Sequence, residues 1–235
     1  RFGRLPGSMH RTVPGAIWLH AVSVGEAITA VGLLKRLREE LPNAPIYVSC
    51  TTLAGRAMAE QKLAGLATAV FYAPIDYRFA VRRVLRTLKP SLVIVMETEI
   101  WPNLYRDARL SGARLLVING RISDKALPKY RKLRWFFRAV LRWPDQIHAQ
   151  DAIAQSRYQQ LGAPTAIASG NLKYDFDPES VHIAPTVQAW LRHTDPERIW
   201  IAASTMPPAE PGDPDEDDIV LDAFVQLRER FPRLL

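Results

Sequence analysis

One acidic residue stands where a strand predicted from the sequence turns into a helix. The segment His20-Ala-Val-Ser-Val-Gly-Glu26 overlaps the apolar run 16–22 and places Glu26 in a first helical turn, beside Ser23 and Gly25. A glycine permits a tight backbone turn, and the positive end of the helix dipole favours an ionised carboxylate. Such a carboxylate could act as a general base. The alternative is that Glu26 only complements the dipole of its own helix.

Other charged residues follow further predicted strands. Glu97 leaves the very apolar run 92–96, Arg56 lies just inside the helix that follows the second strand, and Arg121 follows the fifth strand. Ligands of open α/β sheets bind at the carboxyl ends of the strands, so these side chains indicate a site at that edge. A buried carboxylate needs hydrogen-bond donors or a cation, so Glu97 either takes part in the site or braces the adjacent loop.

Two polar residues near the proposed domain boundary could bind an anion. Lys173 lies in Gly170-Asn-Leu-Lys-Tyr-Asp175, after the seventh predicted strand, although a lysine after a glycine turn is most often an ordinary surface residue. Ser204 lies in the Ser204-Thr205 pair, which could form a phosphate-binding turn or a helix cap. His20 lies inside the first strand and is interpreted as a core residue.

Short β-rich runs alternate with amphipathic helical segments along the chain. The helical segments lie at 25–40, 77–89 and 104–111. This alternation predicts an α/β fold with a Rossmann-like, doubly wound parallel sheet covered on both faces. The predicted strands are 16–22, 46–50, 69–72, 92–96, 114–119, 146–149 and 165–168.

A second unit is predicted to begin near residue 198, with a buried strand at 199–203 and a helix at 219–231. Residues 206–218 between them are rich in proline and acid, which predicts a mobile loop. We expect the natural chain to continue past the last residue. The predicted domains are an N-terminal Rossmann-like domain at 1–176, a linker at 177–197 and the start of a second domain at 198–235.

Composition limits the class of protein. With 48% apolar and 23% charged residues the chain reads as globular, and no apolar run approaches the length of about 20 residues that spans a bilayer. The single cysteine, Cys50, excludes an internal disulfide and offers no zinc-ligand cluster. The net charge is +7, but residues 207–235 hold 3 basic and 8 acidic side chains, so the first 206 residues carry +12. This surplus indicates an anionic partner.

The segment 125–143 contains seven basic residues and no acidic one, interleaved with aromatic and aliphatic residues. We predict a helix with a cationic face that contacts an anionic membrane surface, and a solvated face on an ordinary helix is the alternative. Nucleic acid is disfavoured as a partner, because no recognisable nucleic-acid-binding module is present. The residues assigned to the membrane surface are Arg131, Arg134, Trp135, Arg138 and Arg142.

Taken together, these segments resemble the Kdo transferases, which attach 3-deoxy-D-manno-oct-2-ulosonic acid (Kdo) to the lipid A precursor of bacterial lipopolysaccharide. The likeness covers nearly all of positions 14–206, and the first and third segments are its most specific parts. The matching segments, in order, are His20-Ala-Val-Ser-Val-Gly-Glu26, Ser49-Cys-Thr-Thr52, Glu97-Thr-Glu-Ile-Trp-Pro-Asn103, Gln155-Ser156, Leu161-Gly-Ala163, Gly170-Asn-Leu-Lys173 and Ala203-Ser-Thr205.

The resemblance implies the first domain of a two-domain (GT-B type) glycosyltransferase, in which the N-terminal domain receives the acceptor and the C-terminal domain holds most of the CMP-Kdo donor. The family's N-terminal membrane-anchoring segment and its glycine-rich nucleotide-binding motif have no counterpart in this sequence. Residues 206–218 form a longer proline-rich insertion than the family usually has, which puts the role of Ser204 in doubt. On this basis we expect the chain to be inactive by itself.

The resemblance also implies roles for the site residues. Glu26, flanked by Ser23 and Gly25, would be the general base that deprotonates the acceptor hydroxyl, and Glu97 would orient the site. Lys173 would meet the departing phosphate, while Arg56 and Arg121 would meet acceptor phosphates. The reaction implied is an inverting transfer that needs no cofactor and no bound metal, at the cytoplasmic face of the bacterial inner membrane.

Three other functions were weighed. A dinucleotide-dependent oxidoreductase shares this architecture, but its phosphate-binding turn requires G-x-G-x-x-G after the first strand, where only Gly25 is present. Another GT-B glycosyltransferase with a different acceptor and nucleotide is the nearest alternative. The third is a non-enzymatic module whose basic surface binds an anionic membrane.

Overall fold

The computed structural model describes residues 1–11, 14–175, 183–208, 210 and 212–235. The chain divides into two compact units, Arg1–Phe176 and Asp177–Leu235. The first unit holds a seven-stranded sheet, and the second holds helices α8 (Pro185–Thr194) and α9 (Glu216–Arg230). The assignment of these units as acceptor and donor domains stays a prediction.

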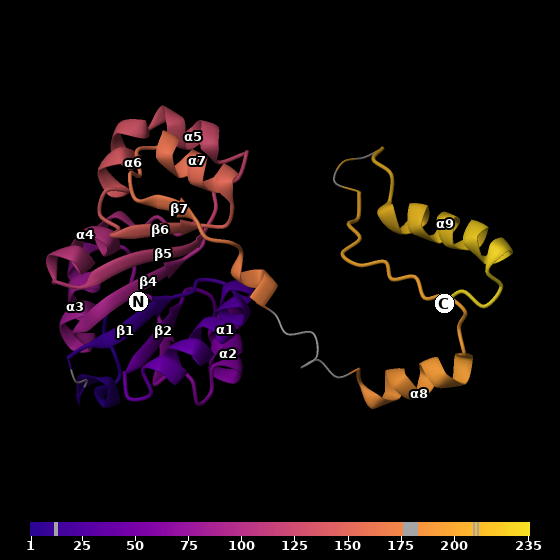
Figure 1. The fold of residues 1–235 in the computed structure, drawn as a ribbon, viewed down its shortest axis with the longest axis horizontal. Coiled ribbons are helices and arrows are strands. Elements are labelled where there is room, and N and C mark those ends of the chain that lie inside the picture. The colour runs from indigo at the N-terminus through magenta and orange to yellow at the C-terminus, as the bar shows by residue number, and fades with distance from the viewer. Residues whose placement is uncertain (12–13, 176–182, 209, 211) are drawn as a thin grey trace. The chain divides into compact units, whose positions relative to one another are not determined.

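All seven strands of the first unit run parallel in one sheet (Figure 1). Their order across the sheet is β3-β2-β1-β4-β5-β6-β7, which confirms the predicted doubly wound parallel fold. Each predicted apolar run forms a strand, with ends that differ by at most two residues. The strands are β1 (Ala16–His20), β2 (Ile46–Cys50), β3 (Ala69–Tyr72), β4 (Pro90–Met96), β5 (Arg114–Gly120), β6 (Gln146–Ala149) and β7 (Ala166–Ala168).

The strand order reverses between β1 and β4. From β1 the chain moves outward to β2 and β3, and from β4 it moves in the opposite direction to β5, β6 and β7. At such a reversal the connections leave the two central strands on opposite faces, which opens a crevice at their carboxyl ends. The residues that follow His20 and Met96 therefore stand on either side of this switch point.

Helices cover both faces of the sheet because alternate strand residues point in opposite directions. Leu19 and Ile94 belong to the core beneath α1 and α2, whereas Trp18 and Val93 belong to the core beneath α3, α4 and α7. The first-unit helices are α1 (Val24–Glu40), α2 (Leu53–Lys62), α3 (Arg78–Leu88), α4 (Pro102–Leu110), α5 (Leu127–Lys132), α6 (Arg134–Val140) and α7 (Ala152–Gln160), with short 3-10 turns η1 (Gly7–Arg11) and η2 (Leu172–Asp175).

The basic segment 125–143 is not one helix, as the sequence predicted, but two short ones that meet at Leu133. Leu133 has a non-helical backbone (φ −109°, ψ 31°), and the change of direction brings the rings of Tyr130 and Phe137 to 4.3 Å between centroids. These rings, with Phe136, pack against the core. Residues seven apart share one face of a straight helix but lie about 10 Å apart along its axis, so the change of direction at Leu133 is what brings these two rings into contact.

The second unit departs from the prediction in three places. Residues 199–203 form no strand, since the only pairing there is an isolated bridge between Arg198 and Leu234, and Ile201 is 79% exposed. A buried strand requires neighbours on both edges, and the described residues supply none. The predicted linker 177–197 contains helix α8, and α9 begins at Glu216, inside the predicted acidic loop. Residues 176–182, 209 and 211 lie outside the described residues.

Across the described residues, we find no helix with both the length and the apolar character needed to traverse a bilayer.

Candidate active site

Glu26 is fixed by the way helix α1 begins. The Ser23 side chain accepts a hydrogen bond from the Glu26 backbone N–H (3.3 Å) and so caps the helix. The carboxylate folds back, where it accepts one hydrogen bond from the Val22 N–H (2.7 Å) and another from the Ser23 hydroxyl (3.0 Å). This is a variant of the capping box, in which a serine and a glutamate three residues later satisfy the free donors of a first turn. The Ser-x-x-Glu spacing could have predicted this contact.

The Glu26 carboxyl group is largely shielded from solvent. Glu26 is only 5% exposed. Burial raises its pKa to about 7, opposed by the two hydrogen bonds from Val22 and Ser23 and assisted by the negative charges of Glu97 and Glu99. Desolvation therefore outweighs the local donors that favour the ionised form. A carboxyl group with this pKa can exchange a proton near neutral pH.

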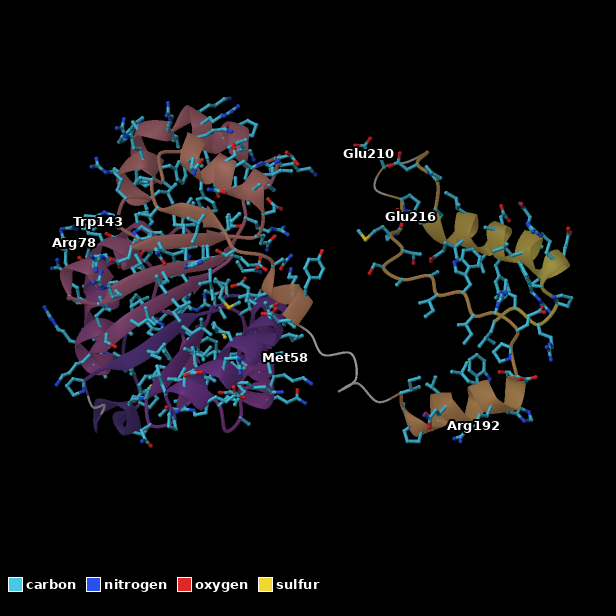
Figure 2. The ribbon with its side chains drawn as sticks, in the orientation of Figure 1. Met58, Arg78, Trp143, Arg192, Glu210 and Glu216 are labelled. Atoms are coloured by element: carbon cyan, nitrogen blue, oxygen red, sulfur yellow. The ribbon has the colours of Figure 1, made fainter. Side chains whose placement is uncertain are left out.

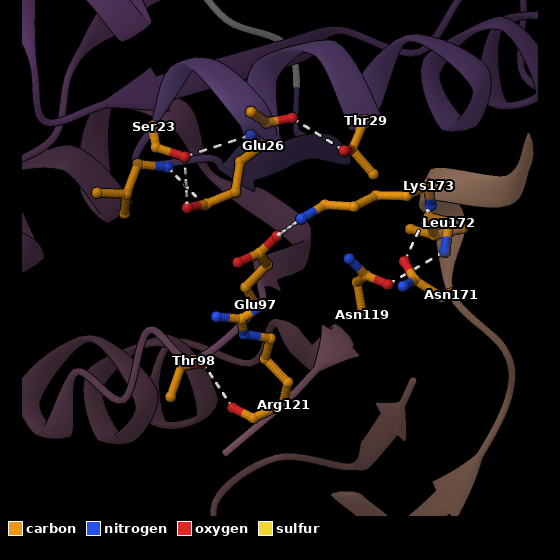
Figure 3. Close-up of polar contacts among 12 residues, drawn as sticks. Ser23, Glu26, Thr29, Glu97, Thr98, Asn119, Arg121, Asn171, Leu172 and Lys173 are labelled. Atoms are coloured by element: carbon orange, nitrogen blue, oxygen red, sulfur yellow. Dashed lines mark hydrogen bonds and ion pairs between the residues drawn. The ribbon is translucent and has the colours of Figure 1, made fainter. Parts of the chain in front are cut away.

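Glu97 lies across the switch point from Glu26. It follows strand β4 and ion-pairs with Lys173, whose Nζ is 3.4 Å from Oε1. Figure 3 shows the Lys173 side chain reaching the Glu97 carboxylate from η2, while the Glu26 carboxylate turns toward Ser23 at the start of α1. The expectation that a cation holds the Glu97 carboxylate is confirmed by this pair. Lys173 thus contacts a site carboxylate in the structure, and its predicted role toward a phosphate stays a prediction.

Two residues at neighbouring strand ends have left-handed backbones. Glu97 after β4 has φ 55°, and Asn119 near the end of β5 has φ 54°. Asparagine adopts this conformation readily, whereas for glutamate it is uncommon and strained. Strain of this kind persists only where the surrounding structure enforces it, and it concentrates at functional sites. Here it accompanies the turn that leaves Glu97 beside the switch point.

Asn119 connects the sheet to the turn that carries Lys173, a role that the sequence did not indicate. The buried Asn119 side chain accepts a hydrogen bond from the Leu172 N–H through Oδ1 (3.1 Å), and the Lys173 N–H donates to Asn171 Oδ1 (3.0 Å). The Asn119 Nδ2 group is buried with no hydrogen-bond partner. The only signal in the sequence is an Asn-Gly pair at a strand end, which does not reveal a contact across 53 residues.

Arg56 and Arg121, the other predicted binding residues of the first unit, form no ion pair with either carboxylate among the described residues. Arg56 pairs with Glu60 (2.8 Å) and stacks over the Tyr72 ring at 4.6 Å, so its charge is already engaged on α2. Arg121 is exposed, and its carbonyl oxygen accepts a hydrogen bond from Thr98. Ser204 is exposed in the second unit with φ 62°. Within the first unit the structure brings Ser23, Glu26, Glu97 and Lys173 together, with Gly25 next to Glu26 in the chain, and leaves Arg56 and Arg121 outside these contacts. The role of Ser204 stays a prediction.

Gly25 does not make the tight turn that the sequence suggested. It lies inside the first turn of α1, and its φ is not among the positive values in the chain. A Cβ atom at this position would meet only the Ser23 Oγ, at 3.9 Å. The exposed Gly25 backbone therefore has room for a small side chain at the start of α1, one residue before Glu26.

His20 is a core residue, as predicted. Its ring is fully buried, its Nδ1 is 2.8 Å from Ser49 Oγ, and it meets the edge of Trp101 with 4.7 Å between ring centroids. Burial lowers its pKa to about 4, against an opposing contribution from Ser49, so the ring is neutral near pH 7. Trp101 packs against the core and donates Nε1–H to Glu99 (2.6 Å).

Among the residues that the structure describes, no cluster of three or more His, Cys, Asp or Glu side chains is arranged to hold a metal ion. The buried Cys50 thiol has a pKa raised to about 12, chiefly by burial, so it is protonated near neutral pH. The chemistry available at the switch point is therefore that of carboxyl groups and one ammonium group.

The fold defines the class of protein. A UDP-GlcNAc 2-epimerase from Neisseria meningitidis, solved with bound UDP-GlcNAc, superimposes with a TM-score of 0.62 over 93% of this chain and 63% of its own. Sequence identity is 15%, so the likeness establishes the fold alone. A further UDP-N-acetylglucosamine 2-epimerase gives the same TM-score at 13% identity, over 94% of this chain and 62% of its own. The chain thus has the GT-B-like α/β fold that the sequence predicted.

Sequence comparison identifies the family. Residues 1–176 match the family described as 3-Deoxy-D-manno-octulosonic-acid transferase (kdotransferase), and the chain belongs to this glycosyltransferase family. It is 33% identical to the 3-deoxy-D-manno-octulosonic acid transferase of Haemophilus influenzae over 94% of this chain and 51% of that protein. It is 29% identical to the 3-deoxy-D-manno-octulosonic acid transferase of Rickettsia prowazekii, over 92% of this chain and 44% of that protein. The chain therefore spans about half the length of these curated relatives.

Proposed function

We propose that this chain forms the acceptor-binding half of an inverting Kdo transferase, which moves Kdo from CMP-Kdo to the lipid A precursor in lipopolysaccharide inner-core synthesis. Membership of the family supports transfer of this sugar. The observation that carries the proposal is the pair of carboxyl groups at the switch point, one of which, Glu26, has a pKa near 7. A general base is most effective when its pKa lies near the working pH.

In the proposed reaction Glu26 takes the proton from a hydroxyl group of the acceptor sugar. The hydroxyl oxygen then forms a bond to the anomeric carbon of Kdo, while the bond from that carbon to the CMP phosphate breaks and its electron pair leaves with CMP. Each Glu26 oxygen accepts only one protein hydrogen bond, so each keeps acceptor capacity for the substrate. The open space at Gly25 admits the acceptor to this carboxyl group.

Glu97 and Lys173 have distinct parts in this proposal. The negative charge of Glu97 raises the pKa of Glu26, which strengthens it as a base. Lys173 holds Glu97 in place and supplies positive charge on the side from which the phosphate departs. Arg121, whose guanidinium group makes no ion pair among the described side chains, is assigned to an acceptor phosphate. Arg56 would have to exchange Glu60 for such a phosphate.

We assign this reaction to the cytoplasmic face of the inner membrane, where an anionic lipid surface would attract the basic first unit. Arg131, Arg134, Arg138 and Arg142 are exposed on and next to α5 and α6, and Trp135 is 74% exposed between them. An exposed indole among arginines is typical of a side chain that enters a headgroup layer.

The test uses the full-length protein with CMP-Kdo and a lipid A precursor, and it measures release of CMP. Glu26→Gln should lower turnover by about 100-fold or more, because the amide cannot accept the proton. Glu40→Gln, at the exposed far end of the same helix, is the matched control and should retain activity. Turnover by the Glu26→Gln protein at the level of the control would refute the proposed role of this carboxyl group.

A further inference from the structure

Helix α3 carries a row of basic side chains that the transfer reaction does not use. Arg78, Arg82 and Arg86 follow each other at intervals of four residues and so lie along one face of the helix. Together with Arg83 and Lys89 they line an open groove of about 1020 Å³. None of the described residues that line this groove is acidic. Figure 2 labels Arg78 on the outer side of the first unit.

Most of this positive charge is uncompensated. Arg82 pairs with Asp107 (3.2 Å), and Arg83 donates a hydrogen bond to the carbonyl oxygen of Phe2 (3.0 Å). Arg78, Arg86 and Lys89 make no ion pair within the described part of the chain. The nearby carboxylate of Asp76 is occupied by backbone N–H groups at the start of α4. Cationic side chains gathered on one surface raise the local potential and attract an anionic partner.

Three aromatic rings stand exposed beside these arginines. Phe2, Tyr77 and Phe79 are 61%, 62% and 54% exposed. Phe79 lies between the other two rings, with stacked centroid distances of 6.3 Å to Phe2 and 6.1 Å to Tyr77. Apolar rings grouped on a surface indicate a contact with another apolar phase. Phosphate groups alone would account for the arginines but not for the rings.

Arginines and exposed aromatic rings on one surface together match the interface of an anionic bilayer. The cationic groups there meet lipid phosphates, while the rings enter the layer between headgroups and acyl chains. Single-stranded nucleic acid also binds through cationic grooves and aromatic rings, but the sequence shows no recognisable nucleic-acid-binding module, so the bilayer is favoured and nucleic acid is an outcome of the test. Of the aromatic residues on α5 and α6, by contrast, only Trp135 is exposed, since Tyr130, Phe136 and Phe137 pack against the core.

We propose that the outer surface of α3, composed of Arg78, Arg82, Arg83, Arg86, Lys89 and the rings of Phe2, Tyr77 and Phe79, docks on an anionic phospholipid bilayer. This α3 surface is separate from the Glu26 site, and the proposal does not depend on the transfer reaction. It adds a second membrane contact to the one assigned to α5 and α6. No sugar transfer is needed to test it, so its failure is distinguishable from failure of the proposed reaction.

The experiment is flotation of this chain with vesicles of phosphatidylglycerol and phosphatidylcholine at low and at high salt. The double variant Arg78→Gln/Arg86→Gln removes two cations that have no ion pair. It should weaken vesicle binding by about 20-fold at low salt, because each basic residue near an anionic surface contributes about a factor of five. The matched control is Lys35→Gln/Lys62→Gln, which removes the same charge from α1 and α2 on the other face of the sheet. This control should lose much less affinity.

A third variant tests the rings. Phe79→Ser should weaken binding at high as well as low salt, because insertion of an aromatic ring does not depend on screening. Thermal unfolding checks that each variant is folded. The proposal is overturned if the α1/α2 control loses as much affinity as the α3 variant, or if only Arg134→Gln/Arg138→Gln on α6 lowers binding. It is also overturned if free inorganic phosphate displaces the chain from vesicles, or if an oligonucleotide binds it more tightly than the vesicles do.

Discussion

Replacement of Glu26 by glutamine should stabilise the first unit at alkaline pH, an unusual outcome for a change at a buried polar site. Glutamine is isosteric with the protonated carboxyl group. Its carbonyl oxygen can accept the Val22 N–H, and its amide can donate to the Ser23 oxygen, so both contacts of the native side chain survive. The variant therefore removes one ionisable group from a desolvated position without leaving an unpaired donor or acceptor.

The size of the effect follows from the shift in pKa. The pKa of Glu26 rises from the model-compound value of 4.5 to about 7 on folding, so the folded state binds the proton more tightly than the unfolded state. Below pH 4.5 the carboxyl group is protonated in both states and contributes no penalty. Between pH 4.5 and 7 the unfolded state loses its proton first, so stability falls as pH rises. Above pH 7 the full penalty is present, about 3 kcal/mol at about 1.4 kcal/mol per pKa unit.

The assay is amide hydrogen exchange of the β1 and β4 peptides across a urea series, read by mass spectrometry, which reports unfolding of the first unit without interference from the second. Glu26→Gln should raise the free energy of unfolding by about 3 kcal/mol at pH 8 and by less than about 1 kcal/mol at pH 5. Glu40→Gln, exposed at the other end of α1, should change it by less than about 0.5 kcal/mol at both values. A Glu26→Gln protein no more stable than the parent at pH 8 would refute a desolvated carboxylate.

Two further outcomes follow from the contacts of single residues. Gly25→Ala should keep or slightly raise the free energy of unfolding, by up to about 1 kcal/mol, because alanine favours the helix and its methyl group has room. CMP release by the full-length protein should nevertheless fall. Full activity would show that the acceptor does not use the space at Gly25. Arg82→Ala should lower the free energy of unfolding in urea by about 2 kcal/mol, because it leaves the buried Asp107 carboxylate without its ion-pair partner. The loss is kept this small because Arg82 is partly exposed and solvent screens its charge. Arg83→Ala is its control, and an equal loss in the two variants would contradict the importance of the ion pair.

The sheet could be predicted from the sequence because its strands are continuous apolar runs separated by amphipathic segments. Parallel strands buried on both faces have this pattern, and all seven predicted runs formed strands. The predicted helix 125–143 failed for a tertiary reason. The chain changes direction at Leu133, where the rings of Tyr130 and Phe137 come into contact, and no local pattern in the sequence marks this break. The predicted strand 199–203 failed because a buried strand depends on partners, which its own apolar residues do not supply.

The site was predictable in part. Residues that follow β1 and β4 meet at the switch point in any sheet of this order, so Glu26 and Glu97 could be placed at one edge from the sequence. The degree of burial of Glu26 could not be predicted from the sequence, because it depends on how the carboxyl group folds back onto Val22. The contact of Lys173 with Glu97 and its support by Asn119 also depend on the path of the chain after β7, which no local pattern encodes.

The central claim is that Glu26 is a carboxyl group held at the switch point with a pKa suited to proton exchange near neutral pH. Its titration can be followed directly by ¹³C NMR of the side-chain carboxyl carbon in selectively labelled protein, with Glu26→Gln used to assign the resonance. We predict a midpoint at about pH 7. A midpoint near 4.5, the value of an ordinary glutamate, would contradict the account.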